Sequence, residues 1–120
     1  MKPRLEKTSF GSITIDGKKY KHDVLIRLDG KVEKRKKKLS KAIYGSSHMI
    51  SLDEAKYIYE PGAHRVLIGT GQFDSVKLSP EAEAFFQQMN CQAQLLPTGK
   101  ALQAWNDAPA GTIGMFHITC

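Results

Sequence analysis

The chain has no long hydrophobic run, and its cysteines are few and far apart. Its apolar stretches, such as residues 66–68, span only a few positions, whereas a membrane-spanning helix needs about 20. Cys91 and Cys120 form neither a CxxC pair nor a zinc-ligand spacing. We therefore expect no membrane span and two reduced thiols, with a disulfide as the alternative.

Several functional signatures are also missing. The first residues, MKPRLEKTSF, contain no apolar signal segment, so we expect a cytoplasmic protein. The four histidines form no HExxH motif, and the glycines at 69–71 are followed by Asp74 where a dinucleotide-binding fingerprint requires a third glycine. We accordingly expect no metal and no cofactor.

The bulk composition fits one globular domain. A chain of 120 residues with 41% hydrophobic residues is long enough to bury a substantial core. No repeat or low-complexity linker divides it, so we expect a single domain over 1–120 with its core at about 10–120. This length alone leaves the oligomeric state open.

The positive charge is concentrated in one segment. The net charge is +6, and residues 31–41 contain seven basic residues and one acidic residue, while the rest of the chain is balanced. Five of the basic residues are consecutive, Lys34 to Lys38. Such a local run is a binding device or a solvated connection, and does not indicate a generally basic protein.

The N-terminal third predicts an antiparallel meander. Alternating segments at 10–15, 20–28 and 31–35 are joined by Asp16-Gly17 and Asp29-Gly30, and Asp-Gly is a strong hairpin signal because both residues accept positive φ. In the second segment, period-two alternation puts His22 on the apolar face and Asp23 on the polar face.

The remainder of the chain alternates between helix and strand. The connection at 36–50 is predicted to be irregular. Ser51, Ser79 followed by Pro80, and Thr98 are the expected helix caps, and Asn90 a left-handed terminator. The expected helices are 51–60, 79–90 and 97–106, and the expected strands are 65–71, 91–96 and 112–120. This order indicates an α/β fold whose sheet has parallel character, with the meander as an extra layer.

Ligands of α/β sheets bind beyond the carboxyl ends of the strands, where helix N-termini favour anions. Two glycine-containing turns, 68–75 and 96–100, occupy such positions, and the basic run could fold over them. We predict a cleft between these turns and residues 35–48 that binds a small anion or an acidic segment of a protein partner. The candidate residues are Lys36, Lys37, Ser47, His48, Gly69, Thr70, Gly71, Thr98 and Gly99.

Three other interpretations stay open. Glycine after a strand and serine or threonine before a helix are what any connection of this kind needs, so the turns can be purely structural. An enzyme could use the same cleft, with His48 as the acid or base. Nucleic-acid binding through Lys34 to Lys38 is the weakest alternative, because only Tyr44 is close enough to stack on a base.

Five segments in order resemble a known family of small domains. They are FGSITIDGKKYKHDVLI, RKKKLSKAIYGSSHMIS, LIGTGQ, LLPTGKALQAWN and the terminal HITC. The family is a domain of unknown function shared by archaeal and bacterial proteins, the human adipogenesis-associated domain protein and a mitochondrial complex I assembly factor. The resemblance implies a three-layer β/β/α fold with a mixed central sheet. It carries over no catalytic residue, and Asp23 and His117 are among its matching positions.

Overall fold

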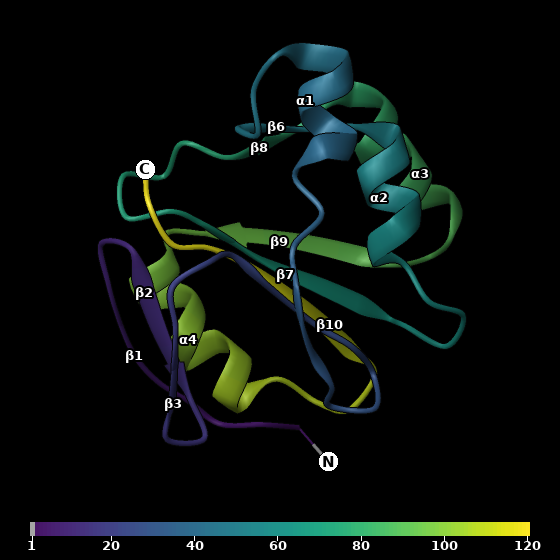
Figure 1. Ribbon diagram of the computed structural model, residues 1–120. Coiled ribbons are helices and arrows are strands. Elements are labelled where there is room, and N and C mark those ends of the chain that lie inside the picture. The colour runs from purple at the N-terminus through teal and green to yellow at the C-terminus, as the bar shows by residue number, and fades with distance from the viewer. Residues whose placement is uncertain (1) are drawn as a thin grey trace.

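A five-stranded mixed sheet forms the centre of the computed structural model, which describes residues 2–120 (Figure 1). Its strand order is β5-β4-β10-β7-β9. The strands are β4 (Val24–Ile26), β5 (Val32–Lys34), β7 (Arg65–Thr70), β9 (Gln92–Leu96) and β10 (Thr112–His117). β10 pairs antiparallel with β4 and parallel with β7, so the last strand along the chain lies in the middle of the sheet.

A second, antiparallel sheet is formed by β1 (Leu5–Ser9), β2 (Ser12–Ile15) and β3 (Lys18–Tyr20). The turn between β2 and β3 has positive φ at both Asp16 and Gly17, 48° and 80°. This is the conformation that the Asp-Gly signal predicts, and the hairpin is confirmed at this position.

The prediction of one continuous strand over residues 20–28 is wrong. This segment is interrupted at His22 and Asp23: β3 stays in the small sheet, whereas β4 and β5 join the central sheet. All three residues of β4 are buried, because β4 is covered on both faces. The half-buried alternation seen in the sequence therefore does not describe this segment, and Asp23 is buried rather than on a polar face.

Four helices complete the fold: α1 (Lys38–Tyr44), α2 (Leu52–Ile58), α3 (Pro80–Gln88) and α4 (Thr98–Asp107). Ser51 and Ser79 cap α2 and α3 by accepting the amide hydrogens of Glu54 and Ala82, as predicted. Asn90 has φ of 54°, also as predicted. Thr98 is not a cap, since Pro97 takes that position. Two short strands, β6 (Met49–Ile50) and β8 (Lys77–Leu78), pair in parallel.

Helix α1 corrects the expectation that 36–50 is irregular. It has seven residues, and Ser40 alone among them is buried. A helix this short has no apolar stripe that its sequence could reveal, so contacts with the rest of the molecule stabilise it.

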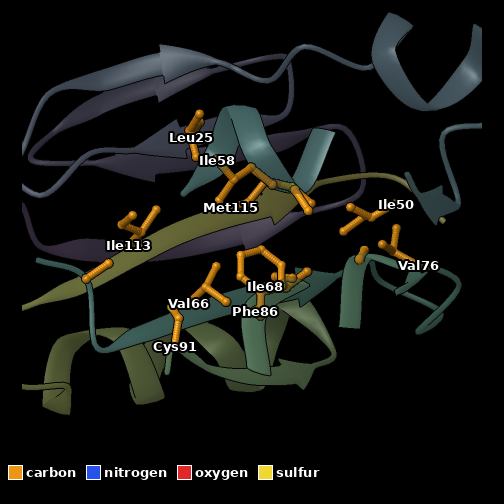
Figure 2. Close-up of a cluster of buried hydrophobic side chains, with 13 residues drawn as sticks. Leu25, Ile50, Ile58, Val66, Ile68, Val76, Phe86, Cys91, Ile113 and Met115 are labelled. Carbon is orange, nitrogen blue, oxygen red and sulfur yellow. The ribbon is translucent and has the colours of Figure 1, made fainter. Parts of the chain in front are cut away.

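Two hydrophobic cores hold three layers together. In Figure 1, α1, α2 and α3 lie on one face of the central sheet, and the β1–β3 sheet and α4 lie on the other. Figure 2 shows the first core, where Phe86 of α3 and Ile58 of α2 pack with strand residues such as Met115. In the second core, Trp105 of α4 meets the Phe116 ring edge-on at 5.9 Å. The three-layer α/β fold is thus confirmed, with α4 sharing the layer of the small sheet.

None of the helices within residues 2–120 has both the length and the apolar character needed to cross a bilayer.

Candidate functional site

A cluster of buried charged and polar side chains lies beneath the basic run. We call Asp23, Arg35, Glu54 and His117 the Arg35 cluster; each is less than 5% exposed. They come from four separate segments: the β3–β4 junction, the residue after β5, helix α2 and the end of β10. Because ionic groups lose hydration when buried, such a cluster is tolerated only if its members pair and hydrogen-bond.

Arg35 satisfies this condition with three partners. Its Nε donates to Glu54 Oε2 at 2.7 Å, and its Nη1 donates to Asp23 Oδ2 at 3.0 Å. Its Nη2 donates to the carbonyl oxygen of Ser47 at 2.7 Å and to Glu54 Oε1 at 3.0 Å. The two bonds to Glu54 form the bidentate arrangement that suits a guanidinium. Burial would lower the pKa of Arg35, but Glu54 and Asp23 outweigh burial and raise it.

Asp23 joins this arginine to the end of the central sheet. Its Oδ2 accepts from His117 Nδ1 at 2.7 Å, and its Oδ1 accepts the amide hydrogen of Ile118 at 2.9 Å. Burial raises the pKa of this carboxyl group, but the bonds from His117 and Ile118 and the charge of Arg35 outweigh burial and lower the pKa to about 2. Asp23 is therefore ionised across the physiological range.

His48 covers the outer side of the cluster. Its ring meets the ring of His117 nearly edge-on, with centroids 5.3 Å apart, and it is half-buried. Desolvation lowers the pKa of His48, and the electrostatic influence of His117, Arg35 and Lys37 adds to this effect, although Asp23 opposes it. At neutral pH the His48 imidazole is uncharged and can accept a proton.

The consecutive basic residues point in different directions. Lys37 is half-buried and places its Nζ 3.6 Å from Asp23 Oδ2. The Nζ of Lys36 lies 4.7 Å from the centroid of the Tyr57 ring, a cation–π contact. The remaining lysines of the run, Lys34 and Lys38, are exposed, as is Lys41 on α1.

The glycine turns are packed against the segment that follows β10. The hydroxyl of Thr98 donates to the His117 carbonyl at 2.6 Å and accepts the Gly71 amide hydrogen at 2.9 Å. A Cβ on Gly71 would lie 2.3 Å from the Cys120 carbonyl carbon, and one on Gly69 would lie 2.8 Å from the Phe116 ring. Both glycines are thus required by close packing.

The predicted residues meet around one side chain, His117. The His48 ring packs edge-on against the His117 ring, Thr98 donates to the backbone carbonyl of His117, and the His117 ring lies 2.8 Å from the Cβ position of Gly71. Lys37 reaches the same place through Asp23, and the Ser47 carbonyl through Arg35.

Of the other four predicted residues, Gly69 and Thr70 lie beside Phe116 and His117 in the register of β7 and β10, whereas Lys36 and Gly99 lie apart. Lys36 turns to Tyr57, and Thr70 bonds to Asp74 Oδ1 at 2.5 Å. Gly99 is exposed, with nothing within 4 Å of its Cβ position. The amides of the first glycine turn are engaged within the protein, since the Gln72 amide donates to the Thr119 carbonyl at 2.7 Å.

Sequence reasoning missed the two central members of the cluster. The basic run does not by itself distinguish Arg35 from the four lysines beside it, and no pattern around Glu54 indicates that it is buried. Asp23 and His117 came forward only through the family resemblance. The single available signal was the arginine itself, the only one in a run of lysines, since arginine is the residue best suited to buried ion pairs.

Two hollows have linings that contain no member of the Arg35 cluster. One, of about 380 Å³, lies between α3 and β9 and is lined by residues such as Phe86, Cys91 and Leu95. The other, of about 340 Å³, lies beside Ile43, Tyr44 and Leu52. Within residues 2–120, no group of three or more His, Cys, Asp or Glu side chains is arranged to hold a metal ion.

These features define a small three-layer α/β domain with a buried ionic cluster at one end of its central sheet. The chain belongs to the family described as protein of unknown function (DUF498/DUF598), whose model matches residues 5–109. No curated protein matches it.

Solved structures with the same fold span nearly the whole chain. A conserved hypothetical protein, PH1505 from Pyrococcus horikoshii OT3, has 28% identity and a TM-score of 0.90, covering 98% of this chain and 99% of that one. MT938 has 26% identity, a TM-score of 0.84 and the same coverage. A Mth938-like domain of Bordetella pertussis, solved by NMR in solution, has 15% identity and a TM-score of 0.63, covering 97% and 85%; at this identity the likeness concerns the fold alone.

Proposed function

We propose that the protein is a non-enzymatic binding or accessory domain that holds an acidic segment of a partner protein on its lysines. The lysine surface is defined as Lys34, Lys36, Lys37, Lys38 and Lys41. The observation that carries the proposal is the division of the basic run: Arg35 is neutralised inside by Asp23 and Glu54. The lysines, four of them exposed, therefore present most of the chain's positive excess to solvent.

The position of the hollows favours an extended partner segment over an enclosed small anion. Neither of the hollows described above has Lys37 or His48 in its lining. The glycine-turn amides that would hold a phosphate are engaged with Thr98 and Thr119. A small anion beside Lys37 and His48 remains the second form of the same proposal, with Ser47, Thr98 and the glycines 69, 71 and 99 as its expected surroundings.

An acidic probe peptide tests this proposal. We expect a fluorescein-labelled oligoglutamate to bind the protein with an affinity that falls as salt rises, since exposed charges are screened beyond about 8–10 Å at physiological ionic strength. Replacing Lys36, Lys38 and Lys41 together by Gln should weaken binding at least tenfold. The matched control replaces Lys7, Lys18 and Lys19, which are also exposed but lie on the other layer.

Each outcome of this experiment is informative. Equal losses in the two triple variants would mean that only net charge matters, and would overturn a defined lysine surface. Tighter binding of single-stranded DNA of equal charge would favour the nucleic-acid alternative. Saturable binding of inorganic phosphate, with a rise in melting temperature, would select the small-anion form.

A second function is favoured by the arrangement of Asp23, His117 and His48. A buried carboxylate orients one imidazole, and a half-buried, uncharged imidazole lies against it. This arrangement suits His48 as an acid or base in an enzyme. Titration of His48 by NMR tests the idea: a pKa of about 6.5 that no candidate substrate shifts would exclude it.

Kinship with the adipogenesis-associated domain protein and the complex I assembly factor stays a prediction from the five sequence segments. It is compatible with a protein partner, because an assembly factor acts by binding other proteins.

A further inference from the structure

The two edges of the central sheet differ in their protection against pairing. β5, at one edge, has three residues and carries Glu33 and Lys34. β9, at the other edge, has five residues and no charged or proline residue, and none of the five is fully buried. Soluble proteins protect edge strands with charge, proline, shortness or bulges. β5 has two of these protections, and β9 has none.

The backbone of β9 is paired on one side only. β9 is bound on one side by β7, in parallel register from Gln92↔Arg65 to Leu96↔Gly69. The Gln92 amide donates inward to the His64 carbonyl at 2.9 Å. Because successive residues of a strand alternate in the direction of their backbone groups, those of Ala93 and Leu95 turn outward. Water can satisfy such outward groups, and another extended backbone can replace that water by adding a strand to the edge.

We propose that a second copy of the chain pairs antiparallel with β9, in a two-fold arrangement centred on Gln94. In this register Ala93 of one copy faces Leu95 of the other, and the two residues exchange their outward backbone hydrogen bonds. Gln94 faces Gln94 in the closely spaced, non-hydrogen-bonded position. The strand is therefore complementary to itself, with no like charges opposed, and the two central sheets become one continuous sheet.

The side chains of β9 also favour a second copy of the chain as the partner of this strand. Ala93 and Leu95 pack against the first core and line the hollow between α3 and β9 together with Phe86 and Leu78. In the two-fold register, Leu95 of the second copy lies beside the small Ala93 on this face. The large side chain then extends the apolar lining where the small one leaves space, which supplies the hydrophobic contact that main-chain pairing alone lacks.

A charge exchange at Gln94 tests the two-fold register. We expect light scattering over a dilution series to show a species of twice the 13.4 kDa chain mass. Gln94→Lys and Gln94→Glu should each weaken dimerisation about fivefold or more, because like charges then face each other. An equimolar mixture of the two variants should restore the dimer. Gln103→Lys on α4, an exposed position, is the control and should dimerise like the unmodified chain.

Amide hydrogen exchange of the unmodified chain gives an independent measurement. The Ala93 and Leu95 amides should become more protected as concentration rises, while the amides of β5 should not change. The proposal is overturned by a monomer at every concentration, by a dimer that survives both Gln94 variants, or by exchange at Ala93 and Leu95 that is independent of concentration.

Discussion

The Arg35 cluster and the lysine surface are made from neighbouring residues of one basic run, yet their charges act in different ways. Arg35 is 4% exposed and is held by carboxylates from two other segments. Lys34 and Lys36, on either side of it, face solvent. Successive side chains of an extended segment point in opposite directions, so one charge turns inward while its two neighbours turn outward.

This difference separates stability from recognition. A buried ion pair contributes to the fold chiefly because removing one partner leaves the other charged and unsatisfied. An exposed lysine contributes little to stability, yet it is free to meet a partner. Mutations along the basic run should therefore have two kinds of effect. Replacing Arg35 should lower stability, whereas replacing the exposed lysines should weaken binding.

The largest effect is expected at Arg35. Arg35→Met keeps much of the side-chain length but leaves Asp23 and Glu54 buried without their shared partner. We expect a loss of about 3–5 kcal/mol in the free energy of unfolding, measured by urea denaturation. Lys34→Met is the control and should change the same quantity by no more than about 0.5 kcal/mol. Similar losses in both variants would remove the distinction between the two regions.

The next effect is a pH dependence that originates in Asp23. Its pKa is about 2 in the folded protein and about 3.9 in an unfolded chain. Since the folded value is the lower one, Asp23 stabilises the fold above pH 4 and loses this contribution as pH falls toward 2. The contribution is about 2 kcal/mol. Asp23→Asn should abolish it, so the difference in unfolding free energy between the two proteins should shrink as acid is added.

A difference that stays constant between pH 5 and pH 2 would show that Asp23 is not held ionised by its partners. Asp53→Asn, on the exposed side of α2, is the matched control for this titration.

A smaller effect is expected at Ser40, the buried residue of α1. Its hydroxyl donates to Glu54 Oε1 and accepts the Ser51 amide hydrogen at 3.0 Å. Ser40→Ala should cost about 1–2 kcal/mol because both partners are buried. The exposed Ser9→Ala should cost little. If thermal denaturation shows no loss for Ser40→Ala, α1 is not anchored to the Arg35 cluster in the way described.

The smallest effect is expected at Lys36. Its contact with the Tyr57 ring should contribute about 0.5–1 kcal/mol. A double-mutant cycle of Lys36→Gln and Tyr57→Leu isolates this coupling. A coupling energy above about 2 kcal/mol would place Lys36 with Arg35 as a structural residue rather than on the lysine surface.

The fold could be predicted wherever a local signal decides the structure. Asp16-Gly17 determines a turn by itself, and Ser51 and Ser79 cap helices through bonds to residues three positions later. The break at His22 and Asp23 could not be predicted in this way. What holds Asp23 is a set of bonds to Arg35, His117 and Ile118, none of which a local pattern contains.

The candidate site shows the same limit. Sequence reasoning brought Gly71 and Thr98 forward because their turns follow strands and precede helices, and His48 because it lies in the connection after the basic run. It could not predict that all three lie against one residue, His117, because His117 comes from another strand, β10. Nor could it tell Arg35 from its lysine neighbours, because the carboxylates that select the arginine lie twelve and nineteen positions away.

The position of β10 affects how the protein can fold while it is being synthesised. β10 is the strand that joins β4 to β7, and it leaves the ribosome after both of them. Until it emerges, β4 and β7 lack their common neighbour, and each exposes a side that the finished sheet conceals. The nascent chain should therefore be most prone to aggregation before β10 emerges, and pauses in translation before residue 112 should increase that loss.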